Sequence, residues 1–96
     1  MYPGNNFTYI STNTTTVIGG TVASGGIRRV NLQGIFINKT LTGTLTVKSG
    51  ATTIGIFAIG TATGTYWLSS GFGIEVADLQ IVTSAADDIT IGWNNM

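Results

Sequence analysis

Residues 41–57, with the sequence LTGTLTVKSGATTIGIF, decide the fold class of this 96-residue chain. Threonine alternates with aliphatic residues over 44–48, the pattern breaks at Ser49-Gly50, and the alternation resumes over 53–59. A period of two is typical of a strand with one buried face, and a glycine between two such runs is typical of a hairpin turn. The stretch therefore predicts a β-hairpin whose first arm points Leu45 toward the core.

The remainder of the chain follows the same pattern, with strand-forming runs and turn signals about every 8–12 residues. We expect strands at residues 14–18, 27–39, 44–48, 53–59, 63–68, 73–77, 79–83 and 88–94, and a further short strand is possible around Phe7 and Tyr9. No helical periodicity persists for the roughly ten residues that a helix needs, and the 14 glycines oppose helix formation. The sequence predicts an all-β fold, an antiparallel β-sandwich or a jelly-roll-like barrel of about eight short strands.

The longest predicted strand, residues 27–39, leaves one question open. Strict alternation from Val30 places Phe36 on the core face, but Ile35 then faces the opposite side. Either Gly34 marks a β-bulge that shifts the phase, or the second half of the strand is buried on both faces.

Length and composition favour one domain within an assembly. We expect residues 17–96 to form a single β-sandwich domain and residues 1–16 to form an N-terminal arm or an edge segment. Charged residues make up 8% of the chain, compared with about 25% in a typical soluble domain. A surface covered mainly by Thr, Ser, Asn and Gly does little to keep neighbouring molecules apart, so it favours association.

Composition also argues against several classes of function. Four cations balanced by four anions cannot neutralise a series of phosphates, so we expect no nucleic-acid partner. No apolar run approaches the roughly 18 residues of a membrane span, so we expect no membrane partner. The chain has no histidine and no cysteine, the side chains that most often supply acid–base or nucleophilic chemistry. We therefore expect neither enzymatic activity nor a cofactor.

The four carboxylates are the remaining candidates for chemistry. Glu75 and Asp78 flank a predicted strand end, and Asp87 and Asp88 lie in a predicted turn. A close carboxylate pair can hydrolyse glycosides only within a cleft, and a calcium ion usually takes six to eight oxygen ligands. Aspartates in turns more often accept hydrogen bonds from nearby backbone N–H groups, so we expect a structural role and no metal.

Two places in the sequence are candidates for partner contacts. The N-terminal segment carries Tyr2, Phe7 and Tyr9 among Asn, Thr and Gly, which suits either an arm that docks on a neighbour or an edge strand held in a sheet. Arg28 and Arg29 hold half of the cations. Arginine is enriched at interfaces, which favours a contact with a partner. Alternatively, the two arginines lie in solvent at the start of a strand.

Two tryptophans have different expected environments. Trp93 alternates with Ile89 and Ile91, so we expect it in the core. Tyr66 and Trp67 are adjacent on a predicted strand, so one of them faces outward. For Tyr66 or Trp67, core filling and a contact surface are both left open.

Three stretches resemble short β-proteins encoded among phage structural genes. GGIRRVNLQGIFIN at residues 25–38 resembles their opening strand, and GTLTVKSGATTIGIF at 43–57 resembles their central hairpin. SSGFGIEV followed by DLQIVTSAADDITIGW, within 69–93, resembles their ending. The resemblance extends over roughly residues 17–93. The family often has Tyr-Asp before the hairpin glycine, where this chain has Lys48-Ser49.

The resemblance implies a small virion protein of a tailed phage or prophage, of the type that decorates or cements the capsid shell by bridging capsomers. It implies the major capsid protein and further copies of this chain as partners, with a trimer favoured, and a location on the outer capsid surface of the virion. The N-terminal arm and Arg28 with Arg29 would then contact the capsid. The alternative is a head-fibre, spike or tail adhesion module whose exposed Tyr66 or Trp67 stacks on host-surface glycan.

Overall fold

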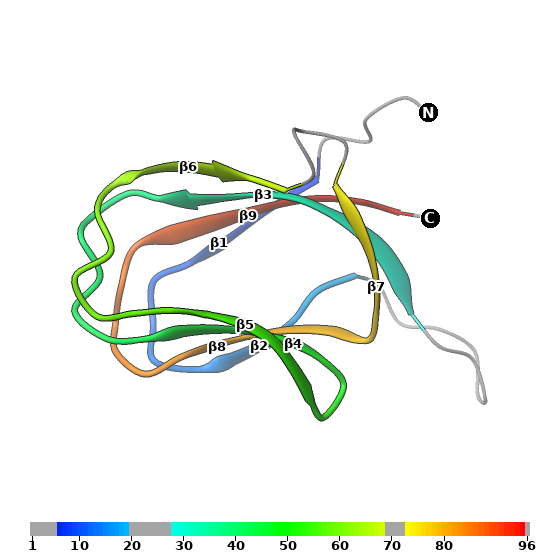
Figure 1. The fold of residues 1–96 in the computed structure, drawn as a ribbon, viewed down its shortest axis with the longest axis horizontal. Helices are drawn as coiled ribbons and strands as arrows, with labels where there is room; N and C mark the ends of the chain where they lie inside the picture. Colours follow the sequence, from blue (N-terminus) through cyan, green and yellow to red (C-terminus); the bar gives the residue numbers. More distant parts are fainter. Residues whose placement is uncertain (1–5, 20–27, 69–72, 96) are drawn as a thin grey trace.

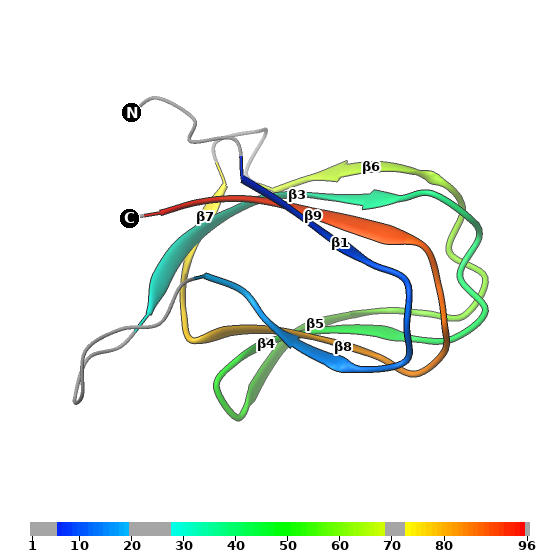
Figure 2. The ribbon, with the colours of Figure 1, turned by 180° about the vertical axis from the view of Figure 1, so that it is seen from behind.

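The computed structural model describes residues 6–19, 28–68 and 73–95. Within these ranges the chain forms nine strands and no helix. The strands are β1 (Asn6–Ile10), β2 (Thr15–Val17), β3 (Arg29–Ile37), β4 (Leu45–Ser49), β5 (Thr52–Phe57), β6 (Gly64–Trp67), β7 (Ile74–Ala77), β8 (Leu79–Thr83) and β9 (Ile89–Asn95). Figures 1 and 2 show them stacked as two layers. The predicted antiparallel β-sandwich is confirmed.

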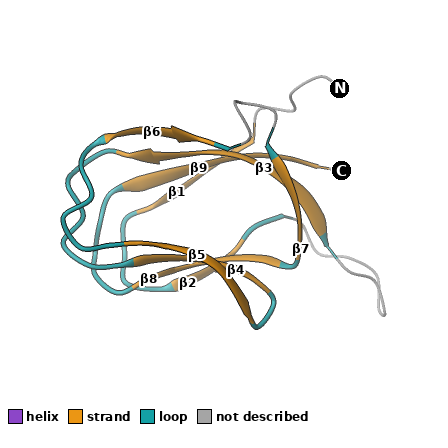
Figure 3. Ribbon diagram, in the orientation of Figure 1, coloured by secondary structure: helices purple, strands orange, loops and turns teal. Residues whose placement is uncertain are grey.

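All strand pairs within the two sheets are antiparallel. Sheet A has the order β1-β9-β3-β6, and β7 pairs with β3 on the same side as β6. Sheet B has the order β2-β8-β4-β5. The connections β1–β2, β3–β4, β5–β6 and β8–β9 all cross between the sheets at one end of the sandwich, the loop end, drawn at the left in Figure 3.

Aliphatic side chains from both sheets fill the space between the layers. Leu45 of β4, Ile81 of β8 and Ile91 of β9 are all 0% exposed. The predicted inward direction of Leu45 is confirmed. Each such side chain contributes about 1.5–3 kcal/mol through removal of its apolar surface from water. Trp93 packs against this core, as its alternation with isoleucine predicted.

A β-bulge in β3 settles the open question about its second half. The pairing of β3 with β9 shifts register between Leu32 and Gly34. Val30 and Leu32 face the core before the shift, and Ile35 faces it afterwards. The expectation from strict alternation that Phe36 lies on the core face is wrong, because the extra residue reverses the direction of every side chain that follows.

The chain passes from sheet A to sheet B at a single residue, Asp78, between β7 and β8. Ala77 pairs with Arg29 in sheet A, and Leu79 pairs with Ser49 in sheet B. Asp78 has a φ of 53°, in the left-handed region that few residues other than glycine adopt. Aspartate is one of the exceptions, because its short polar side chain can form local hydrogen bonds.

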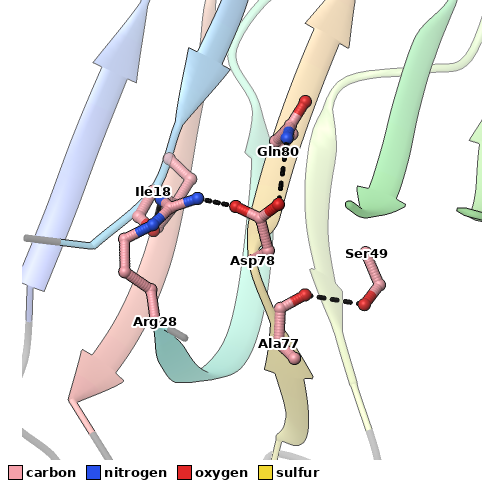
Figure 4. A network of polar contacts seen from close by, with 6 residues as sticks. All are labelled: Ile18, Arg28, Ser49, Ala77, Asp78 and Gln80. Atoms are coloured by element: carbon pink, nitrogen blue, oxygen red, sulfur yellow. Dashed lines mark hydrogen bonds and ion pairs between the residues drawn. The ribbon is translucent and has the colours of Figure 1, made fainter. Parts of the chain in front are cut away.

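Polar contacts hold this corner in place (Figure 4). The guanidinium of Arg28 forms an ion pair with the Asp78 carboxylate and donates a hydrogen bond of 3.1 Å to the carbonyl of Ile18. The Ser49 hydroxyl donates to the carbonyl of Ala77 at 2.6 Å. The corner thus connects the segment after β2, the start of β3 and the β4–β5 hairpin.

We predict that Asp78→Ala lowers the free energy of unfolding more than Asp78→Gly does. Both variants lose the ion pair, but alanine also bears the cost of the left-handed backbone, about 1–2 kcal/mol, whereas glycine adopts it freely. Glycine also raises the conformational entropy of the unfolded chain, which lowers the stability of Asp78→Gly. We therefore expect a net difference of about 0.5–1 kcal/mol in the free energy of unfolding. Urea denaturation of both variants measures it, and equal stabilities would contradict a role for the backbone conformation.

Candidate functional site

The outer face of sheet A carries a continuous group of aromatic side chains. The strand register defines two neighbouring rows across this face, Phe7–Gly92–Gly34–Trp67 and Tyr9–Thr90–Phe36–Thr65. We call the four aromatic residues of these rows, Phe7, Tyr9, Phe36 and Trp67, the aromatic face. The rows contain no charged residue, so the face offers apolar and hydrogen-bonding contacts only.

Two glycines form the floor beneath this face. A Cβ atom at Gly34 would lie 3.0 Å from Cε3 of Trp67, and one at Gly92 would lie 3.5 Å from Cε1 of Phe7. Because Gly34 carries no side chain, the Trp67 ring lies directly on the backbone of β3, whereas the distance at Gly92 is an ordinary van der Waals contact. Aromatic side chains that cover glycines in this way help to stabilise a sheet.

Phe36 joins the two outer rings into one surface. Its ring centroid lies 6.1 Å from that of Phe7 and 5.8 Å from that of Trp67, and the second pair is edge-to-face at 83°. These distances lie within the favourable range for aromatic pairs, about 4.5–7 Å. Phe7 and Trp67 nevertheless remain 61% and 58% exposed. A contiguous exposed apolar surface of this kind marks a candidate interaction site.

The predicted N-terminal contact residues fall in part on this face. Phe7 and Tyr9 lie on β1, which pairs with β9 through all five of its residues. Residues 6–10 are therefore an edge strand of sheet A, which is one of the two possibilities expected for residues 1–16. Tyr2 lies outside the described residues.

The structure does not bring the predicted arginine pair to the aromatic face. Arg28 and Arg29 stand at the start of β3, whereas the aromatic face lies over its second half. The Arg28 side chain is 14% exposed and is engaged with Asp78. The Arg29 side chain is 55% exposed and lies 3.4 Å from a carboxylate oxygen of Glu75, an exposed pair of the kind that contributes about 1 kcal/mol at most.

Of the adjacent aromatic pair, Trp67 faces outward and Tyr66 inward. The Tyr66 ring packs edge-to-face against Phe57 at 5.3 Å, and its hydroxyl donates to the carbonyl of Ala62 at 2.8 Å. Trp67 is therefore the exposed member of the pair. The interior tryptophan, Trp93, donates from its indole nitrogen to the Thr8 hydroxyl at 3.0 Å.

A polar pocket of about 310 Å³ opens at the loop end beside Tyr9. Its lining comes from the β1–β2, β3–β4 and β8–β9 connections and from β1. The lining residues are Tyr9, Ser11, Lys39, Thr40, Thr42, Ala86, Asp87 and Asp88. We call it the loop-end pocket. Its volume is at the lower end of the range for small-molecule sites, about 300–1,000 Å³.

Asp87 holds the floor of the loop-end pocket and is only 5% exposed. Its Oδ1 accepts hydrogen bonds from the backbone N–H and the hydroxyl of Thr42, both at 2.8 Å, and its Oδ2 accepts from the N–H of Gly43 at 3.0 Å. Burial, the largest single influence, raises the pKa of Asp87, but the three hydrogen bonds together outweigh it and leave the pKa below its ordinary value. The structural role expected for this aspartate is what the geometry shows.

Asp88 lies in the wall of the same pocket. Its Oδ1 accepts a hydrogen bond of 3.0 Å from the side-chain amide of Asn38. A side-chain hydrogen bond to Asp88 also raises the pKa of Tyr9, and desolvation and the negative charge of Asp88 act in the same direction. Tyr9 and Asp88 therefore lie close together in the lining of the pocket.

The chemistry that these side chains offer is non-covalent binding. Glu75 and Asp78 each face an arginine, and they do not form a carboxylate pair on a common cleft. Across the described ranges no three His, Cys, Asp or Glu side chains gather to form a metal site. The same ranges contain no helix that is long and apolar enough to cross a membrane.

Sequence reasoning missed two parts of this site. Strict alternation placed Phe36 on the core face, and the bulge at Gly34 that turns this residue outward was only one of the two possibilities that the sequence left open. It also treated Lys39 as the end of a strand that leads through Thr40 into the hairpin, and the pocket that these residues line depends on three connections distant in sequence. Two glycines paired on neighbouring strands, with aromatic residues on either side, indicate an aromatic surface of this kind. The pairing can be recognised only once the strand register is known.

No protein-family model matches the chain, and neither a curated protein nor a solved structure matches it. The family resemblance stated from the sequence therefore remains a prediction.

The lowered pKa of Asp87 predicts a specific loss of stability in acid. Above the ordinary carboxyl pKa, about 3.9, Asp87 is ionised in both states and its full contribution is present. As the pH falls below this value and through the lower pKa of the folded protein, the unfolded chain binds the proton first, so the contribution is lost. Denaturation by urea between pH 5 and the acid limit of folding measures this decline.

The matched variants are Asp87→Asn and Asp88→Asn. We expect Asp87→Asn to lower the free energy of unfolding at neutral pH by about 1–3 kcal/mol, because an amide nitrogen would face the N–H donors, and to flatten the decline in acid. Asp88→Asn leaves the Asp87 hydrogen bonds in place and should retain the decline. An unchanged acid profile in Asp87→Asn would contradict this assignment.

Proposed function

We propose that this chain is a structural protein of a phage or prophage virion that binds the outer surface of the capsid shell and bridges neighbouring capsomers. The observation that carries the proposal is the aromatic face, an exposed and uncharged surface on a rigid sheet. The resemblance of the sequence to short phage virion proteins supplies the class of partner, the major capsid protein.

The chemistry of the aromatic face suits a protein partner. Interface centres are enriched in aromatic side chains and depleted in charged ones, and a few buried aromatic residues carry most of the binding free energy. Trp67 lies low on the sheet because Gly34 lacks a side chain. A stable interface buries about 800 Å² on each partner, and repetition over a shell multiplies modest contacts through effective concentration.

We also propose that copies of the chain associate with one another, with a trimer as the favoured assembly. The supporting feature is β5, the outer strand of sheet B, whose sequence TTIGIF carries no charge. Ile54 and Ile56 on this strand are 46% and 63% exposed. Proteins that remain monomeric commonly protect such edges with charged residues or proline, and β5 has neither.

The test measures binding to capsid shells assembled without this protein. We expect the double variant Phe7→Ala/Trp67→Ala to bind at least about tenfold more weakly, because it removes the two most exposed rings of the aromatic face. Val17→Ala is the matched control, since Val17 is 52% exposed on sheet B. Circular dichroism establishes that each variant is folded, and unchanged occupancy of the double variant would contradict the proposal.

Two separate variants, a deletion of residues 1–5 and the substitution Arg29→Ala, test the other predicted contacts in the same assay. The deletion removes Tyr2 and leaves β1 intact, so it separates an arm from the edge strand. A loss of binding in these variants but not in the double variant would move the capsid contact away from the aromatic face.

The second candidate function is an adhesion module that binds host-surface glycan. The exposure of Trp67 favours it, because an aromatic ring that lies on a sheet offers the stacking surface on which a sugar ring packs. Selective binding to a glycan array that is lost in Trp67→Ala would favour adhesion, and an absence of selective signal would favour the shell protein.

A further inference from the structure

We infer that the loop-end pocket is a saccharide-binding site that takes one ring of a neutral glycan. This inference rests on the second candidate function, adhesion to glycan, and gives it a location other than Trp67.

The pocket is held in shape by bonds within the protein. The Asp87 carboxylate fixes the backbone at Thr42 and Gly43 through hydrogen bonds of 2.8 and 3.0 Å. The Asn38 N–H donates to the backbone carbonyl of Asp88 at 2.9 Å, and the Asn38 side chain donates to the carboxylate of the same residue. Two of the three connections that line the pocket are therefore attached to each other before any ligand arrives, which reduces the entropic cost of binding.

One wall of the pocket is the aromatic ring of Tyr9, which is 60% exposed. A pyranose ring presents an apolar C–H face and an edge of hydroxyl groups, so it packs on an aromatic ring while its hydroxyls reach polar groups at the side. Aromatic side chains of this kind offer contact area at little conformational cost.

The polar lining matches the hydrogen-bonding character of a sugar. The hydroxyls of Ser11 and Thr40 both donate and accept, the Lys39 ammonium only donates, and the Asp88 carboxylate only accepts. A sugar hydroxyl also donates and accepts, so it can bond a carboxylate and an ammonium at the same time.

The charges of the lining favour a neutral ligand over an ion. Lys39 and Asp88 balance each other, and the charge of Asp87 is already satisfied by donors from Thr42 and Gly43. A cation would find one carboxylate available where calcium needs six to eight oxygens, and a phosphate would find a single ammonium.

The pocket continues onto the aromatic face through Tyr9. Tyr9, Thr90 and Phe36 lie in one row across β1, β9 and β3. A glycan whose terminal ring occupies the pocket can therefore extend over the sheet toward Phe36. The loop-end pocket would bind the terminal sugar ring, and the aromatic face would offer contact area for the remaining sugars of the glycan.

The experiment titrates the full chain, labelled with nitrogen-15, with methyl glucoside, methyl galactoside and N-acetylglucosamine, and with glucuronate and glucosamine as charged comparators. We expect saturable shifts of the amide signals of Thr40, Thr42 and Ala86 with at least one neutral sugar. Tyr9→Ala and Lys39→Ala should each weaken this binding by about tenfold. Lys48→Ala is the matched control, since this second lysine lies on β4 in sheet B, and its affinity should equal that of the unmodified protein.

Each result bears on the inference. An absence of saturable shifts with every sugar overturns it, as does tighter binding of glucuronate or glucosamine than of the neutral sugars. Saturable shifts confined to the surroundings of Trp67 overturn the pocket assignment and leave the adhesion function in place. Loss of shell binding in the Phe7→Ala/Trp67→Ala variant concerns the first proposed function alone, so the two failures are distinguishable.

Discussion

The sandwich depends on a corner that one residue makes. Asp78 belongs to neither sheet, yet the strand before it pairs in sheet A and the strand after it pairs in sheet B. Its left-handed backbone turns the chain, its N–H donates to the carbonyl of Arg28 at 2.8 Å, and its carbonyl accepts from Gly50 at 2.9 Å. Asp78 therefore fixes where β7 of sheet A and β8 of sheet B meet at this edge of the sandwich.

The surface chemistry of sheet A is a consequence of the strand register that this packing allows. The bulge before Gly34 directs Ile35 into the core and Phe36 outward. The same register places Gly34 beside Gly92, and the absence of a side chain at Gly34 makes room for the Trp67 ring on the backbone. One inserted residue thus affects both faces of sheet A, because it completes the interior on one face and an aromatic surface on the other.

The sequence predicted the fold class well because alternation and turn residues are local signals, and in β4, β8 and β9 nothing interrupts them. It also predicted the interior position of Trp93, which follows from the same period. The direction of Phe36 could not be predicted with certainty, since a bulge changes the phase without a change in composition. The loop-end pocket was beyond reach, because Tyr9, Lys39 and Asp88 come together only through the order of the strands. The ion pair between Arg28 and Asp78 could not be predicted, because the two residues lie fifty positions apart in the sequence.

The two tryptophans provide the molecule with a pair of natural optical reporters. Trp93 sits against the interior with its indole nitrogen bonded to Thr8, whereas the ring of Trp67 lies in solvent contact over Gly34. A collisional quencher in solution reaches the second ring far more readily than the first. Emission recorded with and without the quencher therefore separates events on the surface of sheet A from loosening of the interior, with no dye attached.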